Sequence, residues 1–144
     1  MKFDHAGLVV AKMASGRDHL SALFSITRWS EEFADHGIGV YVQFGLDPSG
    51  MCYELVAPLR DDSPVSRALA SRDRILNHVA YLVPDLEAET ARIRRLRCLP
   101  AGPAMPAVAY GGRRVQFFVS PLAFIIELIE APDHIHGYFE VSPG

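Results

Sequence analysis

The segments FDHAGLVV at residues 3–10 and LNHVAYLV at residues 76–83 share one apolar pattern with a histidine at the third position. Apolar runs of this length, rich in branched and aromatic side chains, predict β-strands. A shift of 73 residues superposes the two segments and places His5 over His78. Each predicted strand therefore carries one histidine at an equivalent position.

The same shift continues to match residues further along the chain. Without a gap it superposes VQF at 42–44 on VQF at 115–117, and Glu54 on Glu127. Chance rarely matches isolated polar residues and an identical tripeptide in one alignment. The sequence therefore indicates an internal duplication, and this has to be recognised before a fold is assigned.

The first copy predicts a strand, a helix and then further strands. Ser15 or Asp18 is the predicted N-cap of the helix. Further β-rich segments follow at 37–46 and 51–57, separated by a DPSG turn. The apolar stripe of the helix consists of Leu20, Leu23 and Phe24.

The second copy repeats this order. Asp85 is the predicted N-cap of its helix and Pro100 the predicted end, with acidic residues early and basic residues late, as the helix dipole favours. Strand-like segments follow at 113–119 and 123–129. The apolar side of this helix consists of Leu86, Ala88, Ile93, Leu96 and Leu99.

Composition limits the function classes. The chain has 144 residues, of which 49% are hydrophobic and 22% charged, so one globular domain is expected. Its 14 basic against 17 acidic residues disfavour nucleic acid as a partner. No apolar stretch is long enough for a membrane span, and two cysteines without a Cys-x-x-Cys spacing fit a reducing cytoplasm.

The repeat also sets the predicted domain organisation. A single domain is expected over 1–132, with a first module at 1–59 and a second at 75–132. A polar linker at 60–74, with a short amphipathic helical piece, joins the modules, and a tail at 133–144 follows them. In that tail, His134 and His136 alternate, which predicts either packing over the domain or a weak surface metal site.

The two repeated glutamates need a physical explanation. Alternate side chains of a strand point to opposite faces, so Glu54 and Glu127 each lie on a face of the predicted sheet. A buried carboxylate without a partner costs several kcal/mol. If the modules pack as related halves of one sheet, both carboxylates converge with His5 and His78, a set that suits Zn, Ni, Co, Mn or Fe(II). Ordinary core histidines and edge glutamates, or His–Glu ion pairs without a metal, are the alternatives.

Four segments carry a resemblance to a known family: FDHAGLVV (3–10), YELVAPL (53–59), LNHVAYLVPDLEA (76–88) and FFVSPLAFIIELIEAP (117–132). They resemble the vicinal-oxygen-chelate superfamily, which includes glyoxalase I, methylmalonyl-CoA epimerase, extradiol dioxygenases and antibiotic-resistance proteins. The resemblance covers residues 1 to about 132, and its first three segments are most similar to methylmalonyl-CoA epimerase. It implies an α+β fold in which two tandem βαβββ modules form one curved mixed sheet around a metal-binding cup.

The resemblance further implies that His5, Glu54, His78 and Glu127 are the ligands of one divalent metal ion. Epimerases usually have Gln at the second of these positions, whereas bacterial glyoxalase I has Glu, so the ligand set is glyoxalase I-like. Extradiol dioxygenases typically use two His and one Glu. Four apparent ligands therefore argue against oxygen activation.

One departure from the epimerase pattern concerns the catalytic base. Epimerases of this kind place a carboxylate near the start of the third strand of the first module, but residues 36–46 contain neither Asp nor Glu. Glu54 and Glu127 are then the expected catalytic residues, because a loosely held ligand carboxylate can also move a proton.

The resemblance implies a divalent-metal-dependent isomerase or lyase. Its expected substrate is a small carbonyl compound or acyl thioester, processed through a metal-stabilised enolate, as in methylmalonyl-CoA epimerase. A non-catalytic, resistance-type binding protein and an extradiol-type dioxygenase are the alternatives. The expected partner is a small molecule, and a homodimer is compatible with the superfamily.

Overall fold

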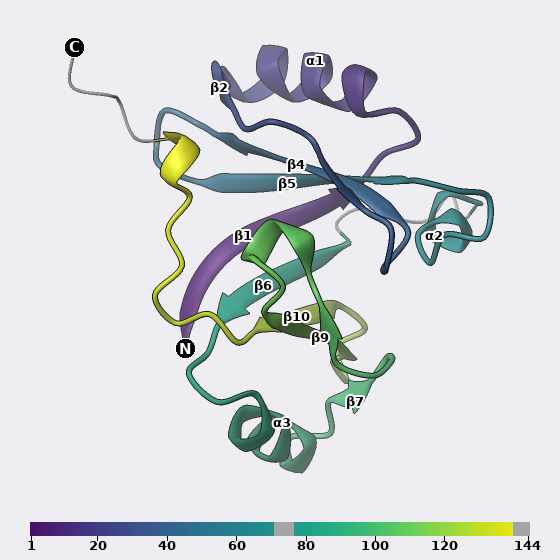
Figure 1. Cartoon of the computed structure of the whole chain (residues 1–144), viewed down its shortest axis with the longest axis vertical. Coiled ribbons are helices and arrows are strands. Elements are labelled where there is room, and N and C mark those ends of the chain that lie inside the picture. The colour runs from purple at the N-terminus through teal and green to yellow at the C-terminus, as the bar shows by residue number, and fades with distance from the viewer. Residues whose placement is uncertain (71–76, 140–144) are drawn as a thin grey trace.

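A computed structural model describes residues 1–70 and 77–139 (Figure 1). The described strands are β1 (Lys2–Val9), β2 (Arg28–Trp29), β3 (Phe33–Asp35), β4 (Val40–Leu46), β5 (Cys52–Pro58), β6 (His78–Leu82), β7 (Leu99–Pro100), β8 (Met105–Pro106), β9 (Arg114–Val119) and β10 (Ile125–Ile129). The described helices are α1 (Met13–Phe24), α2 (Ser66–Ala70) and α3 (Leu86–Arg95), with 3-10 turns η1 (Val108–Tyr110) and η2 (Gly137–Phe139).

The ten described strands form one curved, open sheet. Its order is β2-β4-β5-β1-β6-β10-β9-β7, with β3 paired to β4 and β8 paired to β9. Helices α1 and α3 pack on the sheet (Figure 1). The chain passes through all the strands of one half before it enters the other half. The predicted α+β class with one curved mixed sheet is confirmed.

A local twofold relates the halves at the centre of the sheet. Strands β1 and β6 run antiparallel, with His5 opposite Ala80 and Gly7 opposite His78. A shift of 73 residues exchanges these two pairs, so the axis passes through the β1–β6 ladder. The duplication in the sequence is therefore also a symmetry of the hydrogen-bonded ladder.

The flanking strands follow the same register. Strand β5 is parallel to β1 and places Glu54 opposite Gly7, while β10 is parallel to β6 and places Glu127 opposite Ala80. Because side chains alternate along a strand, Glu54 and Glu127 point to the inside of the curved sheet, and their neighbours point to the helices. Leu55 packs under α1 with Leu20, and the core under α3 is assembled in the same way.

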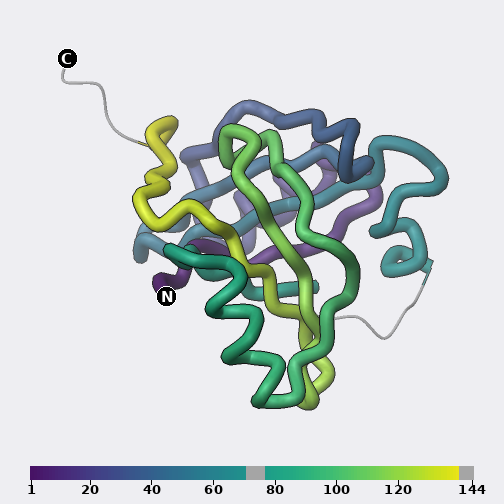
Figure 2. The backbone as a smooth tube through the Cα atoms, turned by 60° about the horizontal axis from the view of Figure 1, so that its bottom comes forward, coloured from purple at the N-terminus to yellow at the C-terminus, as the bar shows by residue number. Residues whose placement is uncertain are grey.

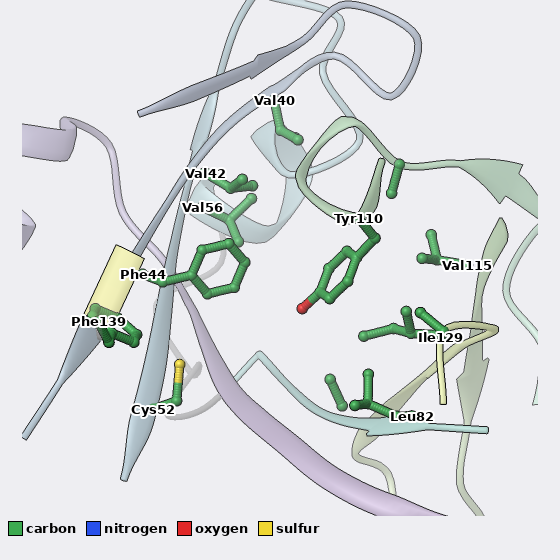
Figure 3. Packing of buried hydrophobic residues seen from close by; sticks show 13 residues of the cluster. Val40, Val42, Phe44, Cys52, Val56, Leu82, Tyr110, Val115, Ile129 and Phe139 are labelled. Carbon is green, nitrogen blue, oxygen red and sulfur yellow. The ribbon is translucent and has the colours of Figure 1, made fainter. Parts of the chain in front are cut away.

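The inner core is shared by the two halves. Figure 3 shows Phe44 from β4 and Tyr110 from η1 facing each other, with ring centroids 6.2 Å apart. Phe139, from the tail, is buried in the same cluster. Side chains from distant parts of the chain thus enclose the inside of the sheet.

The predicted start of α1 is wrong. The helix begins at Met13, and Lys12 at the N-cap position makes no side-chain capping hydrogen bond, so neither Ser15 nor Asp18 is the cap. Its buried stripe is Met13, Gly16 and Leu20, whereas Leu23 and Phe24 are exposed. Contact with the sheet decides the orientation of this helix, because tertiary packing outweighs local propensity.

The predictions for α3 are confirmed at one end only. Asp85 caps the helix, since its side chain accepts a hydrogen bond from the backbone N–H of Ala88 at 2.9 Å. The helix ends at Arg95, before the predicted Pro100, because Arg97 adopts a left-handed conformation with φ 68°. Leu96 and Leu99 are consequently exposed rather than part of the apolar stripe.

The linker and tail lie at the limits of the described chain. Helix α2 corresponds to the short helical piece predicted in the linker, while residues 71–74 of the linker, 75–76 of the second module and 140–144 of the tail lie outside the described residues. In Figures 1 and 2 residues 133–139 of the tail leave the second half and run along the first. None of the described helices is long and apolar enough to cross a bilayer.

Candidate metal centre

The two central strands and their parallel neighbours bring four polar side chains together. His5, Glu54, His78 and Glu127 are 0%, 5%, 2% and 4% exposed. Each offers one ligand atom, and these atoms all lie within 4.8 Å of one another. The structure thus brings together all four residues that the sequence selected. Their role as metal ligands stays a prediction.

Hydrogen bonds on the far side of each ring define the imidazole tautomers. Nδ1–H of His5 donates to Oδ2 of Asp4 at 2.8 Å, and Nδ1–H of His78 donates to Oδ1 of Asn77 at 2.7 Å. A carboxylate oxygen and an amide oxygen can only accept, so both Nδ1 atoms carry the proton. The Nε2 atom of each neutral ring therefore presents a lone pair to the cluster.

The two lone pairs face each other. Nε2 of His5 and Nε2 of His78 are 3.1 Å apart, and each lies 3.1–3.5 Å from a carboxylate oxygen of Glu54 or Glu127. Opposed lone pairs beside two carboxylates repel unless a proton or a cation lies between them. Imidazole nitrogens with an anchored second nitrogen are the usual ligands of transition metals.

The pKa shifts indicate how protons are held in the cluster when no metal is bound. Burial by itself would lower the pKa of His5, but Glu54 and the hydrogen bond to Asp4 raise it well above its usual value. The pKa of His78 shifts in the same direction because the neighbouring carboxylates of Glu127 and Glu54 outweigh burial. Burial would raise the pKa of Glu54, yet His5 and His78 lower it to about 2. A metal-free cluster therefore holds extra protons, which a bound cation would displace.

One oxygen in the cluster is left without a donor. Oε2 of Glu127 lies 3.1 Å from Nε2 of His78 but accepts no hydrogen bond from the described part of the chain. Buried carboxylate oxygens are normally hydrogen-bonded or bound to a cation. This oxygen, the opposed Nε2 atoms and the N₂O₂ donor set all fit a divalent metal ion.

Gly7 makes room for one of the rings. A Cβ at this position would lie 2.0 Å from Cε1 of His78 and 2.3 Å from its Nε2. The ring of His78 therefore lies directly against the backbone of β1. Glycine is required here by this close approach rather than by a turn.

Tyr110 belongs to the site, although nothing in the sequence singled it out. Its hydroxyl donates to Oδ2 of Asp4 at 2.6 Å and lies 3.0 Å from Nδ1 of His5. Burial and the charge of Asp4 raise the pKa of Tyr110, so the hydroxyl keeps its proton. Burial would raise the pKa of Asp4, but hydrogen bonds from His136 and His5 lower it well below its usual value. Asp4 therefore stays an anionic acceptor behind His5.

A cavity of about 400 Å³ lies against the cluster. Glu54, His78 and Glu127 line it, whereas His5 has no exposed surface. The wall is mostly apolar, with side chains that include Val40, Val42, Val56, Met105, Val115 and Phe117. A small molecule in this cavity would meet a polar floor and a water-excluding wall.

Asp35 is a carboxylate of this cavity that the sequence prediction missed, because the search for a base began at residue 36. It is buried at the end of β3 and lines the cavity. Its Oδ1 accepts a hydrogen bond from the N–H of Ile38 at 3.0 Å, and its Oδ2 one from the N–H of Val108 at 2.9 Å. The available signal was an Asp directly before the HGIG turn. The base predicted to be missing thus has a candidate one residue outside the searched stretch.

Comparisons with known proteins were made for sequence and fold. A sequence model of the Glyoxalase/Bleomycin resistance protein/Dioxygenase superfamily matches residues 4–117. No curated protein matches the sequence significantly. Methylmalonyl-CoA epimerase from Mycobacterium tuberculosis has a similar structure, with a TM-score of 0.72 at 22% identity over 89% of this chain and 86% of that chain.

Two further solved structures show the same fold. A hypothetical protein from Bacillus halodurans C-125 gives a TM-score of 0.78 at 19% identity, over 94% of this chain and 97% of that one. A variant of Streptomyces coelicolor methylmalonyl-CoA epimerase, in complex with 2-nitronate-propionyl-CoA, gives 0.70 at 20% identity, over 90% of this chain and 96% of that one. At these identities the similarity establishes the fold.

Proposed function

Because the chain belongs to the glyoxalase/bleomycin resistance protein/dioxygenase superfamily, we propose that it is a divalent-metal-dependent isomerase or lyase of the methylmalonyl-CoA epimerase type. Its proposed substrate is a small carbonyl compound or acyl thioester. The main support is the convergence of the Nε2 atoms of His5 and His78, 3.1 Å apart, with the buried carboxylates of Glu54 and Glu127. The fold shared with epimerases agrees with this proposal.

His5, Glu54, His78 and Glu127 would hold one divalent metal ion, which could be Zn, Ni, Co, Mn or Fe. A bound ion of this kind supplies a Lewis acid that polarises a carbonyl oxygen. The two modules, 1–59 and 75–132 with the linker 60–74, would act as one unit, since each contributes one imidazole and one carboxylate.

The carboxylates of the cavity would move the proton. Glu54 and Glu127 are related by the local twofold, and so approach a substrate between them from two sides. Asp35 lines the same cavity from β3 and adds a third carboxylate. Removal of a proton next to a carbonyl by one carboxylate, and its return by another, is the general acid–base chemistry that epimerisation requires. The apolar wall would exclude water and hold an uncharged part of the substrate.

A non-catalytic binding protein is the second candidate, and the apolar cavity of about 400 Å³ favours it. The cavity could hold a small molecule without any reaction. An enzyme and a binding protein differ in what the metal and the carboxylates contribute, and this difference can be measured.

The test combines metal analysis with hydrogen–deuterium exchange. The purified protein is analysed for metal, and the loaded protein is incubated in D₂O with methylmalonyl-CoA and other acyl thioesters. We expect about one metal per chain and exchange at the carbon next to the thioester. Glu127→Gln and Asp35→Asn are expected to slow exchange at least about 100-fold, the usual range for loss of an acid or base. Glu31→Gln, at an exposed position, is the control and should exchange normally.

Other outcomes contradict the proposal. Metal-free protein that binds the thioester as well as loaded protein would indicate a binding protein. Fe(II)-dependent oxygen uptake with catechols would indicate an extradiol-type dioxygenase. Full exchange in both Glu127→Gln and Asp35→Asn would show that the acid–base roles are assigned incorrectly.

A further inference from the structure

We propose that the C-terminal segment 133–139 is a functional part of the metal centre, in which His136 positions Asp4 and thereby holds His5 in place as a ligand. The inference rests on the proposed metal centre. It assigns His136 a positioning role behind the four ligands.

A continuous hydrogen-bond path connects the segment to the centre. The hydroxyl of Tyr138 bonds Nδ1 of His136, and Nε2–H of His136 donates to Oδ1 of Asp4 at 3.0 Å. The other carboxylate oxygen, Oδ2, accepts from Nδ1–H of His5 at 2.8 Å and from Tyr110. Each oxygen of Asp4 is therefore bound from a different part of the chain, and His136 is the donor on Oδ1.

The local twofold shows that this path is specific to one half. Asp4 and Asn77 occupy equivalent positions, and each bonds Nδ1 of the histidine that follows it. An anionic acceptor makes an imidazole a stronger electron donor than a neutral amide does. A carboxylate in this position also needs further donors when it is buried, because its remaining lone pairs would otherwise lack partners. His136 and Tyr110 supply these donors to Asp4.

The segment is packed so that His136 is held against Asp4. The ring centroids of His136 and Phe44 are 4.8 Å apart, and those of Tyr138 and Phe33 are 6.1 Å apart. Phe139 is buried in the inner core. Figure 2 shows the segment following the first half close to the N-terminal strand that carries Asp4 and His5. None of residues 133–139 lines the cavity, so the segment lies outside the substrate path.

Two substitutions separate the donor of His136 from its packing. His136→Phe keeps an aromatic ring against Phe44 but removes the N–H, while His136→Gln keeps an N–H donor of similar reach. Loss of an outer hydrogen-bond partner typically weakens metal binding 10–100-fold. We expect His136→Phe to weaken binding about 10-fold, and His136→Gln to remain within about 3-fold of the unsubstituted protein.

The experiment measures binding of Co²⁺ to the full chain. Affinity is obtained by competition with a chelator, and the d–d absorption of bound Co²⁺ reports the ligand field. Asp4→Asn should weaken binding about as much as His136→Phe, and the double variant should bind about as well as Asp4→Asn alone, because His136 acts through Asp4. Ile135→Ala, at an exposed neighbouring position, is the control and should leave both readouts unchanged. Melting in chelator confirms that each variant is folded.

The outcomes distinguish this inference from the proposed function. If the unsubstituted chain binds neither Co²⁺ nor Zn²⁺, the proposed metal centre is wrong. If it binds Co²⁺ and folded His136→Phe has unchanged affinity and spectrum, the positioning role is wrong. A second equivalent of Co²⁺ that disappears in His134→Asn would also overturn the inference, because His134, His136 and Asp4 would then be ligands themselves.

Discussion

Replacement of Gly7 by alanine tests the geometry of the candidate metal centre most directly. The added Cβ would lie 2.0 Å from Cε1 of His78, whereas ordinary contacts begin at 3.4 Å. The imidazole must then retreat by at least about 1.4 Å, since the strand backbone is held on both edges by its ladders.

This displacement is large compared with what a metal site tolerates. Metal–nitrogen distances are about 2.0–2.1 Å, with a tolerance of about 0.2 Å. His78 would therefore cease to be a ligand. We expect metal affinity to fall at least about 100-fold, equivalent to about 2.8 kcal/mol. The metal-free protein should lose about 1–3 kcal/mol of unfolding free energy through overpacking.

Two measurements separate these effects. Competition with a chelator gives the Co²⁺ or Zn²⁺ affinity, and urea unfolding in EDTA gives the stability of the metal-free chain. Ala80→Gly is the matched control, because Ala80 lies opposite His5 as Gly7 lies opposite His78. It removes a Cβ instead of adding one, and affinity should stay within about 3-fold. Metal affinity of Gly7→Ala equal to that of the unsubstituted protein would refute the close approach of His78 to β1.

Three further predictions follow from the same structure. Leu128→Ala creates a cavity in the core beneath α3 and should lower the unfolding free energy, measured by urea unfolding, by about 2–5 kcal/mol. A loss below about 1 kcal/mol would contradict the burial of Leu128. Saturation with metal at about 100 times its Kd should raise stability by about 2.7 kcal/mol over protein in EDTA, and equal melting temperatures would count against a folded-state metal site. The pKa of His5 is raised in the folded protein, so protonation of His5 stabilises the metal-free protein. This stabilisation is complete below pH 6.5 and is lost as the pH rises through the raised pKa. The melting temperature of the metal-free protein should therefore fall from about pH 6 towards 9. Metal affinity should increase with pH over the same interval because the bound imidazoles carry no Nε2 proton, and a metal-free melting temperature that rises with pH would contradict the shift.

Local patterns predicted the strands better than the helix ends. Alternation placed Glu54 and Glu127 on a face of the sheet, and the structure shows that this is the inner face; a strand has only two faces to choose from. Asp85 was recognisable as a cap since its side chain bonds within three residues. Ser15 and Asp18 looked equally suitable, but packing of Met13 and Gly16 on the sheet starts α1 earlier. An N-cap side chain contributes about 1 kcal/mol to stability, and a few buried apolar contacts contribute more.

The duplicated sequence by itself determined that two equivalent half-units exist, and hence that His5, Glu54, His78 and Glu127 occupy matching positions. The repetition can be detected because both copies lie in one sequence and can be aligned with each other. Only the tertiary structure decided that Asp35, Tyr110 and His136 belong to the same region, since their positions depend on how loops and the tail pack across the halves. Those contacts join residues up to 132 positions apart, and no periodicity along a single strand or helix encodes them.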